Sequence, residues 1–174
     1  MSELNRYSGF IGLWIVEKES GLPLTSLELE EKAHIDSVLF GGFLVAIRGL
    51  MTDLEIGQLN SFRTDTADLL ITGSEKILSV LAIEKNTNVD LWYPTLVSLH
   101  RKSEEFYEEY KKREMVIDTA KFAILKPQFR EIILKNIQDL AKLDAELNDS
   151  EFKESDDSKK AKKAAKKLED SGLW

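Results

Sequence analysis

Residues 12–29 (GLWIVEKESGLPLTSLEL) and 76–99 (KILSVLAIEKNTNVDLWYPTLVSL) carry the strongest secondary-structure signals of the chain. The first stretch overlaps an apolar run from Phe10 to Glu17. The apolar side chains of this run fall on two faces, one with Ile11, Leu13 and Ile15 and the other with Phe10, Trp14 and Val16. Because both faces are apolar, we predict a strand in the covered centre of a sheet.

A second strand is predicted from Leu22 to Leu29. Glu19, Ser20 and Gly21 precede it and have the composition of a turn, so the two strands read as a hairpin. Pro23 lies near the start of the second strand. Because proline cannot donate a hydrogen bond to a neighbouring strand, we place this strand at an edge of the sheet.

Residues 35–51 (IDSVLFGGFLVAIRGLM) are too long for a strand and indicate a helix, with Asp36 or Ser37 as its N-cap. One stripe at helical spacing consists of Ile35, Leu39, Gly42, Ala46 and Gly49. Glycine inside a helix costs about 1 kcal/mol relative to alanine, so three glycines in one helix indicate close approach to another surface. The three are Gly41, Gly42 and Gly49. The surface is either the chain's own sheet or a partner, and we predict that Gly42→Leu destabilises the fold by overpacking.

Three short strands are predicted next, at residues 57–64, 67–73 and 77–84. The last of them, ILSVLAIE, is apolar throughout and suits the centre of a covered sheet. The first, GQLNSFRT, has only Leu59 and Phe62 as apolar residues, and we place it at the other edge. An exposed edge strand can accept a strand from a second chain.

Two helical regions follow the strands. Residues 89–113 have an apolar stripe opposite a run of charged residues, which we interpret as an ordinary solvated face. Residues 115–147 form a further helical region that we expect to be interrupted near Pro127. Its apolar stripe, which we expect to pack on the sheet, consists of Phe129, Ile132, Ile133, Ile137, Leu140 and Leu143.

This order of elements resembles that of longin-domain proteins, within the wider group of longin and roadblock domains that serve small GTPases and membrane traffic. The resemblance covers residues 7–147 and is carried by the element order and by the stretches 12–29 and 76–99. It implies an α/β (α+β) fold with a five-stranded antiparallel sheet, the order β-β-α-β-β-β-α-α and helices on both faces. Roadblock domains begin with an extra helix, for which only Met1 to Gly9 is available here, so a longin fits better.

The resemblance also implies protein docking through the helix after the second strand and the neighbouring edge strand, here residues 36–51 and 57–64. The candidate partner-binding residues are Gly41, Gly42, Val45, Arg48, Leu59, Phe62 and Arg63. The implied partner is a small Ras-like GTPase or a complex of vesicle trafficking, and formation of a homo- or heterodimer is compatible with this class. The chain lacks the coiled-coil segment of a longin SNARE.

Composition favours one globular domain, since 43% of the 174 residues are apolar and 32% are charged. We predict that the domain covers residues 1–147 and that 148–174 is a charged tail. No run approaches the roughly 18 apolar residues of a membrane span, and MSELNRYSG lacks a signal-peptide pattern. We therefore expect a cytoplasmic protein that is at most peripheral at membranes. The absence of cysteine excludes disulfides and thiolate metal sites.

The predicted tail is acidic and then basic, a low-complexity composition that buries little apolar surface. We expect it to be disordered or transiently helical. Its functional reading is weak contact with an acidic membrane surface, a partner or nucleic acid, of which nucleic acid is the least favoured. The residues for such contact are Lys159, Lys160, Lys162, Lys163, Lys166, Lys167 and Trp174. Trp174 alternatively anchors the tail on the domain itself.

The sequence contains no catalytic, nucleotide-binding or metal-binding motif. His34 and His100 lie far apart and have no metal-ligand spacing, and Thr72 to Lys76 lacks the glycine spacing of a phosphate loop. We predict a non-catalytic docking or regulatory module without cofactor or metal. The alternatives are a PAS-like or GAF-like ligand sensor, which needs a polar cavity between sheet and helices, and an enzyme without recognisable motifs, which needs convergent titratable groups.

Overall fold

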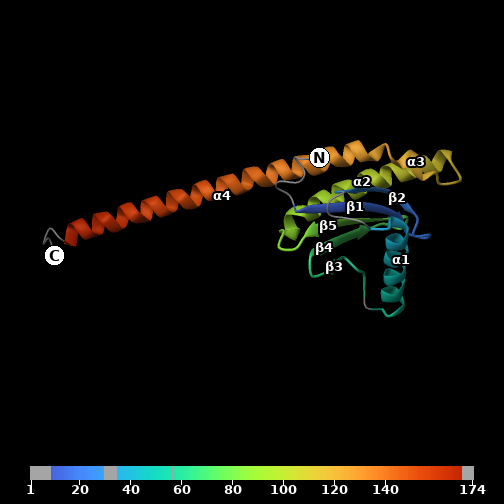
Figure 1. Ribbon diagram of the computed structural model, residues 1–174, viewed down its shortest axis with the longest axis horizontal. Coiled ribbons are helices and arrows are strands. Elements are labelled where there is room, and N and C mark those ends of the chain that lie inside the picture. The colour runs from blue at the N-terminus through green and yellow to red at the C-terminus, as the bar shows by residue number, and fades with distance from the viewer. Residues whose placement is uncertain (1–8, 30–34, 56, 170–174) are drawn as a thin grey trace. The chain divides into compact units, whose positions relative to one another are not determined.

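The computed structural model describes residues 9–29, 35–55 and 57–169. Its strands are β1 (Phe10–Glu17), β2 (Pro23–Glu28), β3 (Ser61–Arg63), β4 (Ala67–Gly73) and β5 (Ile77–Glu84). Its helices are α1 (Ser37–Asp53), α2 (Val89–Arg113), α3 (Thr119–Phe122) and α4 (Leu125–Glu169). The order along the chain confirms the predicted α/β class (Figure 1).

The strands form one antiparallel sheet in the order β2-β1-β5-β4-β3. As predicted, β1 and β5 are central and apolar, and β2 and β3 are the two edges. The predicted strand at 57–64 is shortened to Ser61–Arg63. Gly57, at φ 98°, turns the backbone before the chain can pair with β4. This φ lies in a region that side-chain-bearing residues avoid.

A β-bulge in β1 changes which face two of its side chains take. The register of β1 against β5 shifts between Phe10 and Gly12, so strict alternation fails there. Phe10 stacks on Trp92 of α2 at 6.1 Å between ring centroids, and Ile11 packs against the core cluster around Trp14. The predicted assignment of Ile11 and Phe10 to faces is therefore wrong, because an inserted residue reverses the alternation on its N-terminal side.

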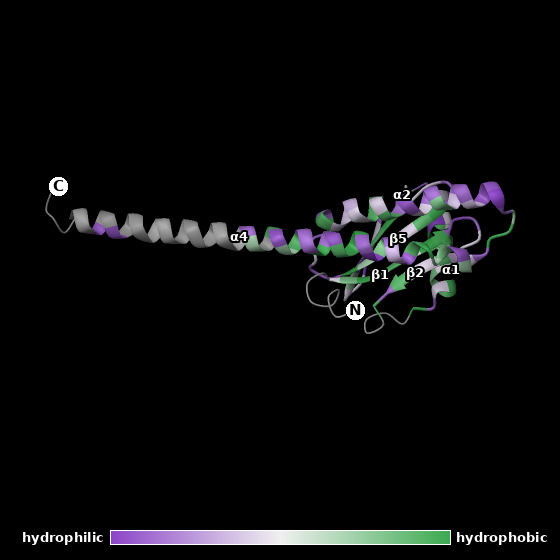
Figure 2. Ribbon diagram, turned by 90° about the horizontal axis from the view of Figure 1, so that it is seen from above, coloured by the Kyte–Doolittle hydropathy of each residue, from purple (hydrophilic) through white to green (hydrophobic). Residues whose placement is uncertain are grey.

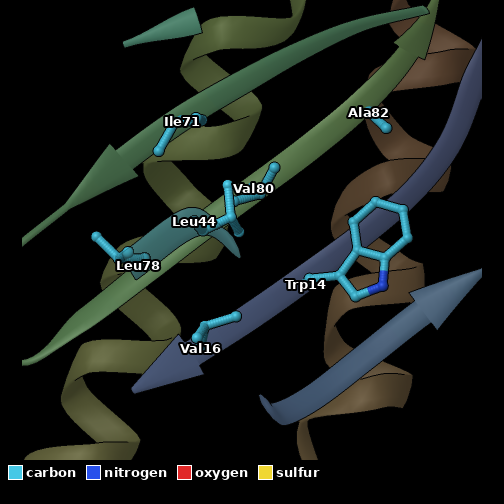
Figure 3. Close-up of a cluster of buried hydrophobic side chains, with 7 residues drawn as sticks. All are labelled: Trp14, Val16, Leu44, Ile71, Leu78, Val80 and Ala82. Atoms are coloured by element: carbon cyan, nitrogen blue, oxygen red, sulfur yellow. The ribbon is translucent and has the colours of Figure 1, made fainter. Parts of the chain in front are cut away.

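Helix α1 covers one face of the sheet. The buried cluster between them contains Leu44 of α1 and Trp14, Val16, Ile71, Leu78, Val80 and Ala82 of the strands (Figure 3). Of the two predicted N-cap candidates, Asp36 is the N-cap: its carboxylate accepts hydrogen bonds from the backbone N–H groups of Val38 and Leu39 at 2.9 and 3.2 Å. This cap fixes where α1 begins.

The glycines of α1 differ in their surroundings. A Cβ on Gly41 would collide with the carbonyl oxygen of Gly21 in the β1–β2 turn, so Gly41 is the close-approach residue. A Cβ on Gly42 or Gly49 would meet no atom within 4 Å. The prediction that Gly42 lies at a tight contact is wrong, and the overpacking expected for Gly42→Leu loses its basis. The predicted stripe of Ile35, Leu39, Gly42, Ala46 and Gly49 is the exposed side of the helix. Both sides of α1 are apolar, so the apolar stripe alone does not identify the side that packs on the sheet.

Helix α2 lies on the opposite face of the sheet, with the first turns of α4 beside it (Figure 3). Asn88 caps α2, and the buried residues of its inner side include Trp92, Leu96 and Leu99. The second half of α2 is hydrophilic on its outer side (Figure 2). The amphipathic pattern that predicted this helix is thus explained by one face in the core and one face in water.

The helical region is interrupted close to Pro127, as predicted, but the break precedes the proline. The break lies at residues 123–124, between α3 and α4, and Pro127 is in the first turn of α4. A proline is tolerated there because N–H groups of the first turn have no partner within the helix. Phe122 is fully buried against the rings of Phe106 and Tyr110, at 5.1 and 5.2 Å, which anchors α3 to α2.

The apolar stripe of α4 is buried only in part. Phe129, Ile133 and Ile137 are buried, whereas Leu143, predicted to pack on the sheet, is 46% exposed. Internal contacts divide the chain into two compact units, Met1–Ile137 and Gln138–Trp174. Leu143 belongs to the second unit and so lies beyond the part of α4 that packs in the first.

In the second unit, α4 continues through Glu169. The sequence suggested disorder or a transient helix for the charged tail in this region. Alanine, lysine and glutamate are strong helix formers, which accounts for helical backbone in this composition. The predicted domain limit at residue 147 stays a prediction. Over the described parts of the chain, no helix is both long enough and apolar enough to cross a membrane.

Candidate docking surface

The outer face of α1, defined by Val38, Leu39, Gly42, Phe43, Ala46, Gly49, Leu50 and Leu54, turns away from the sheet and is apolar. Leu39 is 73% exposed, Val38 66% and Leu50 57%. The segment from Ser37 to Ile47 contains no charged residue. An exposed apolar patch of this kind is typical of an interaction site.

The edge strand β3 continues this surface. Phe62 is opposite Leu69 of β4, whose side chain packs on the core cluster under α1, so Phe62 lies on the same side of the sheet as α1. Phe62 is 37% exposed, and its ring meets that of Phe43 edge to face at 6.3 Å. The Phe43–Phe62 contact therefore joins the helix face and the strand edge into one surface.

Beside Phe62, Arg63 is exposed and its Nε lies 3.5 Å from the carboxylate of Asp68 on β4. The pair ties the end of β3 to β4, with a small energetic effect because the arginine is solvated. Within the described residues β3 pairs with β4 alone, so its outer edge is unpaired. An unpaired edge can accept a strand from a partner.

A hollow of about 220 Å³ with polar and apolar residues in its lining opens between the second half of α1, residues 57–59 and the start of β5. Its lining includes Lys18, Val45, Arg48, Gln58 and Leu59. Burial lowers the pKa of the Arg48 guanidinium from its ordinary value. The alternative function, a ligand sensor, requires a cavity between sheet and helices that is lined with polar groups, and the lining of this hollow is only partly polar.

The structure separates the predicted partner-binding residues into three groups. Gly42, Phe62 and Arg63 are exposed, as a docking role requires. Val45, Arg48 and Leu59 are half-buried and line the hollow. Gly41 is buried against the β1–β2 turn and cannot reach a partner.

Sequence reasoning missed the most exposed apolar side chains of the surface. These are Val38, Leu39, Phe43, Leu50 and Leu54. A signal was present, because an amphipathic helix has a charged face and α1 has none between Ser37 and Ile47. A helical segment that is apolar on all sides is typically covered, by its own fold or by a partner.

Two side chains on the other face of the sheet resemble a catalytic pair. Ser79 Oγ lies 2.9 Å from His100 Nδ1, and His100 Nε2 lies 4.0 Å from a carboxylate oxygen of Glu104. Ser79 is fully buried in β5, so its hydroxyl is not accessible to a substrate. We interpret the contact as a structural hydrogen bond between β5 and α2, since a nucleophile has to reach the group it attacks.

Burial lowers the pKa of His100, and the nearby Glu104 raises it to a smaller extent. The ring is therefore held in its neutral form, which suits a hydrogen bond with a serine hydroxyl. Over the residues that the structure describes, no group of three or more histidine, aspartate and glutamate side chains could hold a metal ion. His34 lies outside these residues.

Of the tail residues predicted to contact a membrane or a partner, Lys163 and Lys166 are exposed on α4. The helix also contains Lys159, Lys160, Lys162 and Lys167. Trp174 lies outside the described residues, so its predicted role as an anchor stays a prediction.

No protein-family model and no curated protein matches the chain. Among solved structures, a Roadblock/LC7 domain from Streptomyces avermitilis is 11% identical, with 62% of this chain and 92% of that chain covered and a TM-score of 0.47. MglB of Myxococcus xanthus is 19% identical, with 63% and 89% covered and a TM-score of 0.41. MglC of the same organism is 20% identical, with 51% and 79% covered and a TM-score of 0.30.

These likenesses transfer no residue role to this chain. The fold itself follows from the topology, because one helix follows the second of five antiparallel strands and the remaining helices follow the fifth. With α1 on one face and α2 on the other, the chain has the longin-like fold that longin and roadblock domains share.

Proposed function

We propose that this chain is a non-catalytic protein-docking or regulatory module that binds its partner through the outer face of α1 and the edge of β3. The observation that carries the proposal is the exposure of Val38, Leu39 and Leu50 on a helix whose opposite side is in the core. Leaving such side chains in water forgoes about 25 cal/mol of stabilisation for each Å² of apolar surface. A partner that covers them recovers this free energy.

The partner class that fits the fold is a small Ras-like GTPase or a complex of membrane traffic. Helix α1 offers an apolar helix face, and β3 offers backbone groups for an added strand. Both are recurring modes of recognition between proteins. A second copy of the chain is compatible with the same surface.

The charge distribution predicts how this binding responds to salt. The chain has a net charge of −7, but the outer face of α1 carries almost none of it. Contact through this face is mainly hydrophobic, and screening by salt acts on charges. We therefore expect the affinity for the partner to change little as the ionic strength rises.

The test compares aspartate substitutions on and off the surface. Leu39→Asp and Phe62→Asp place a charge in the proposed contact, and Val97→Asp, at a residue of α2 that is 46% exposed, is the matched control. Capture from native cell extract with a GTP analogue or with GDP, together with sedimentation velocity for self-association, measures binding. We expect Leu39→Asp and Phe62→Asp to weaken binding by about 30-fold or more, because residues central to an interface cost about 2 kcal/mol when lost.

The far-UV circular dichroism spectra of all three variants should match that of the unmodified protein. Preference for the GTP analogue or for GDP would identify a GTPase partner. Unchanged binding by Leu39→Asp, or an equal loss with Val97→Asp, would contradict the proposed surface.

A further inference from the structure

Two cationic side chains, Lys18 and Arg48, line the hollow beside α1. Lys18 follows β1, and its Nζ donates a hydrogen bond to the backbone oxygen of Ser74 in the β4–β5 turn, at 3.2 Å. Arg48 comes from α1, and its Nη1 would lie 3.2 Å from a Cβ added to Gly73, the residue before Ser74. Two elements far apart in sequence thus bring positive charges to one turn.

Neither cation is neutralised by the part of the chain that the structure describes. The ion pairs among those residues include neither Lys18 nor Arg48. The guanidinium of Arg48 is half-buried and makes no hydrogen bond there, although it carries five N–H donors. Partial burial of an unpaired cation is unfavourable, and a bound anion would compensate for it.

The rest of the lining limits what the hollow can take. Gln58 contributes a side-chain amide, whereas Leu59 and Leu78 contribute apolar surface. The Thr52 hydroxyl donates to the backbone oxygen of Arg48 at 3.0 Å, so its proton is already used. At about 220 Å³ the hollow is smaller than the roughly 300–1,000 Å³ of sites that hold drug-sized ligands. It fits one compact polar group.

We propose that this hollow binds the phosphate monoester group of a small soluble molecule, with Arg48 and Lys18 as its charged ligands. A phosphate monoester carries a charge of about −1.5 to −2 at pH 7, which matches two cations better than a single carboxylate does. The planar fork of Arg48 suits two phosphate oxygens, and Lys18 acts as a point charge beside it. The site does not depend on the docking function, because Arg48 faces the hollow and not the outer face of α1.

The test is calorimetric titration of the full chain with inorganic phosphate and with glycerol 3-phosphate, and with acetate at matched ionic strength. We expect saturable binding of both phosphates at a single site and none of acetate. Arg48→Gln and Lys18→Gln should each weaken phosphate binding about tenfold or more, because each substitution removes a charged hydrogen-bond donor from the phosphate. Arg101→Gln and Lys102→Gln, at exposed residues of α2, make the same changes of charge and should leave the affinity within about twofold.

A second measurement keeps the test decisive if Arg48→Gln does not fold. Phosphate added to the unmodified, ¹⁵N-labelled chain should shift the amide resonances of Gly73 and Ser74 and leave those of α2 in place. Vesicles containing phosphatidic acid provide the lipid-borne form of the same group. Binding to the vesicles without binding to free phosphate would overturn the assignment to a small molecule.

The site itself would be overturned if the unmodified chain showed no saturable binding. It would also be overturned if Arg101→Gln weakened binding as much as Arg48→Gln, since that result indicates only a general attraction between charges. Equal affinities for acetate and phosphate would overturn the choice of a monoester.

Discussion

Helices α1 and α2 cover opposite faces of the same sheet but differ on the side that faces away from it. The second half of α2 presents charged residues such as Arg101, Lys102 and Glu109 to solvent. The outer face of α1 presents Val38, Leu39 and other apolar residues. A helix that only completes a domain core needs one apolar side. The second apolar side of α1 therefore points to a task beyond folding.

The largest expected change in stability comes from shortening a side chain on the inner side of α1, compared with the same change on its outer face. Leu44→Ala removes a buried side chain from the core cluster, and we expect a loss of about 2–5 kcal/mol in the free energy of unfolding. Leu39→Ala, at a residue that is 73% exposed, should change it by less than about 0.5 kcal/mol. Urea denaturation of both variants measures the difference. Equal losses would mean that the outer face of α1 is covered within the chain itself.

The next largest change in stability distinguishes the adjacent glycines Gly41 and Gly42 of α1. Gly41→Ala places a methyl group against the backbone of Gly21, and overpacking should cost about 1–3 kcal/mol of stability. Gly42→Ala meets open space, so the better helix propensity of alanine should stabilise the protein by up to about 1 kcal/mol. Thermal unfolding measures the stability of the two variants, and we expect a lower melting temperature for Gly41→Ala than for Gly42→Ala. A destabilised Gly42→Ala together with a neutral Gly41→Ala would place the inner face of α1 one residue further along.

The smallest effect concerns the inner side of α2 and its response to pH. Because the pKa of His100 is lowered in the folded chain, the unfolded chain takes up a proton first as the pH falls. The stability contributed by the neutral imidazole is thus present above the ordinary pKa of about 6.5 and is lost as the pH falls through it towards the lowered value.

We expect His100→Gln to reduce the fall in unfolding free energy between about pH 7 and pH 5. His34→Gln, at the chain's other histidine, is the matched control. Urea denaturation across this range measures both. An identical pH profile for His100→Gln and the unmodified chain would show that His100 is not the group that titrates.

Much of the fold could be predicted from local patterns. The predicted ranges of β1, β4, β5 and α2 agree with the structure, and the N-cap of α1 is one of the two predicted candidates, Asp36. In these segments the apolar period, the turn residues and the capping residue all indicate the same element. Proline at the start of β2 and the polar composition of β3 were sufficient to place both at the edges of the sheet.

The candidate surface could be predicted only as a region. The sequence indicated α1 and the edge strand, but it selected Gly41, which is buried, and missed Leu39, which is the most exposed apolar residue of α1. Periodicity identifies the inner side of a helix through the contrast between apolar and charged residues. In α1 this contrast is absent, so contact with the β1–β2 turn decides which glycine is inside.

The sequence by itself determined the order of the elements, the antiparallel sheet with its two edges, and the presence of a helix without a charged face. Only the tertiary structure decided that Phe10 and Ile11 exchange faces at a bulge, that Ser79 meets His100, and that Lys18 and Arg48 converge on one turn. The physical reason is the range of the interactions involved. Propensity, capping and periodicity act over a few neighbouring residues, whereas these contacts join residues that the chain brings together only when the sheet and its helices pack.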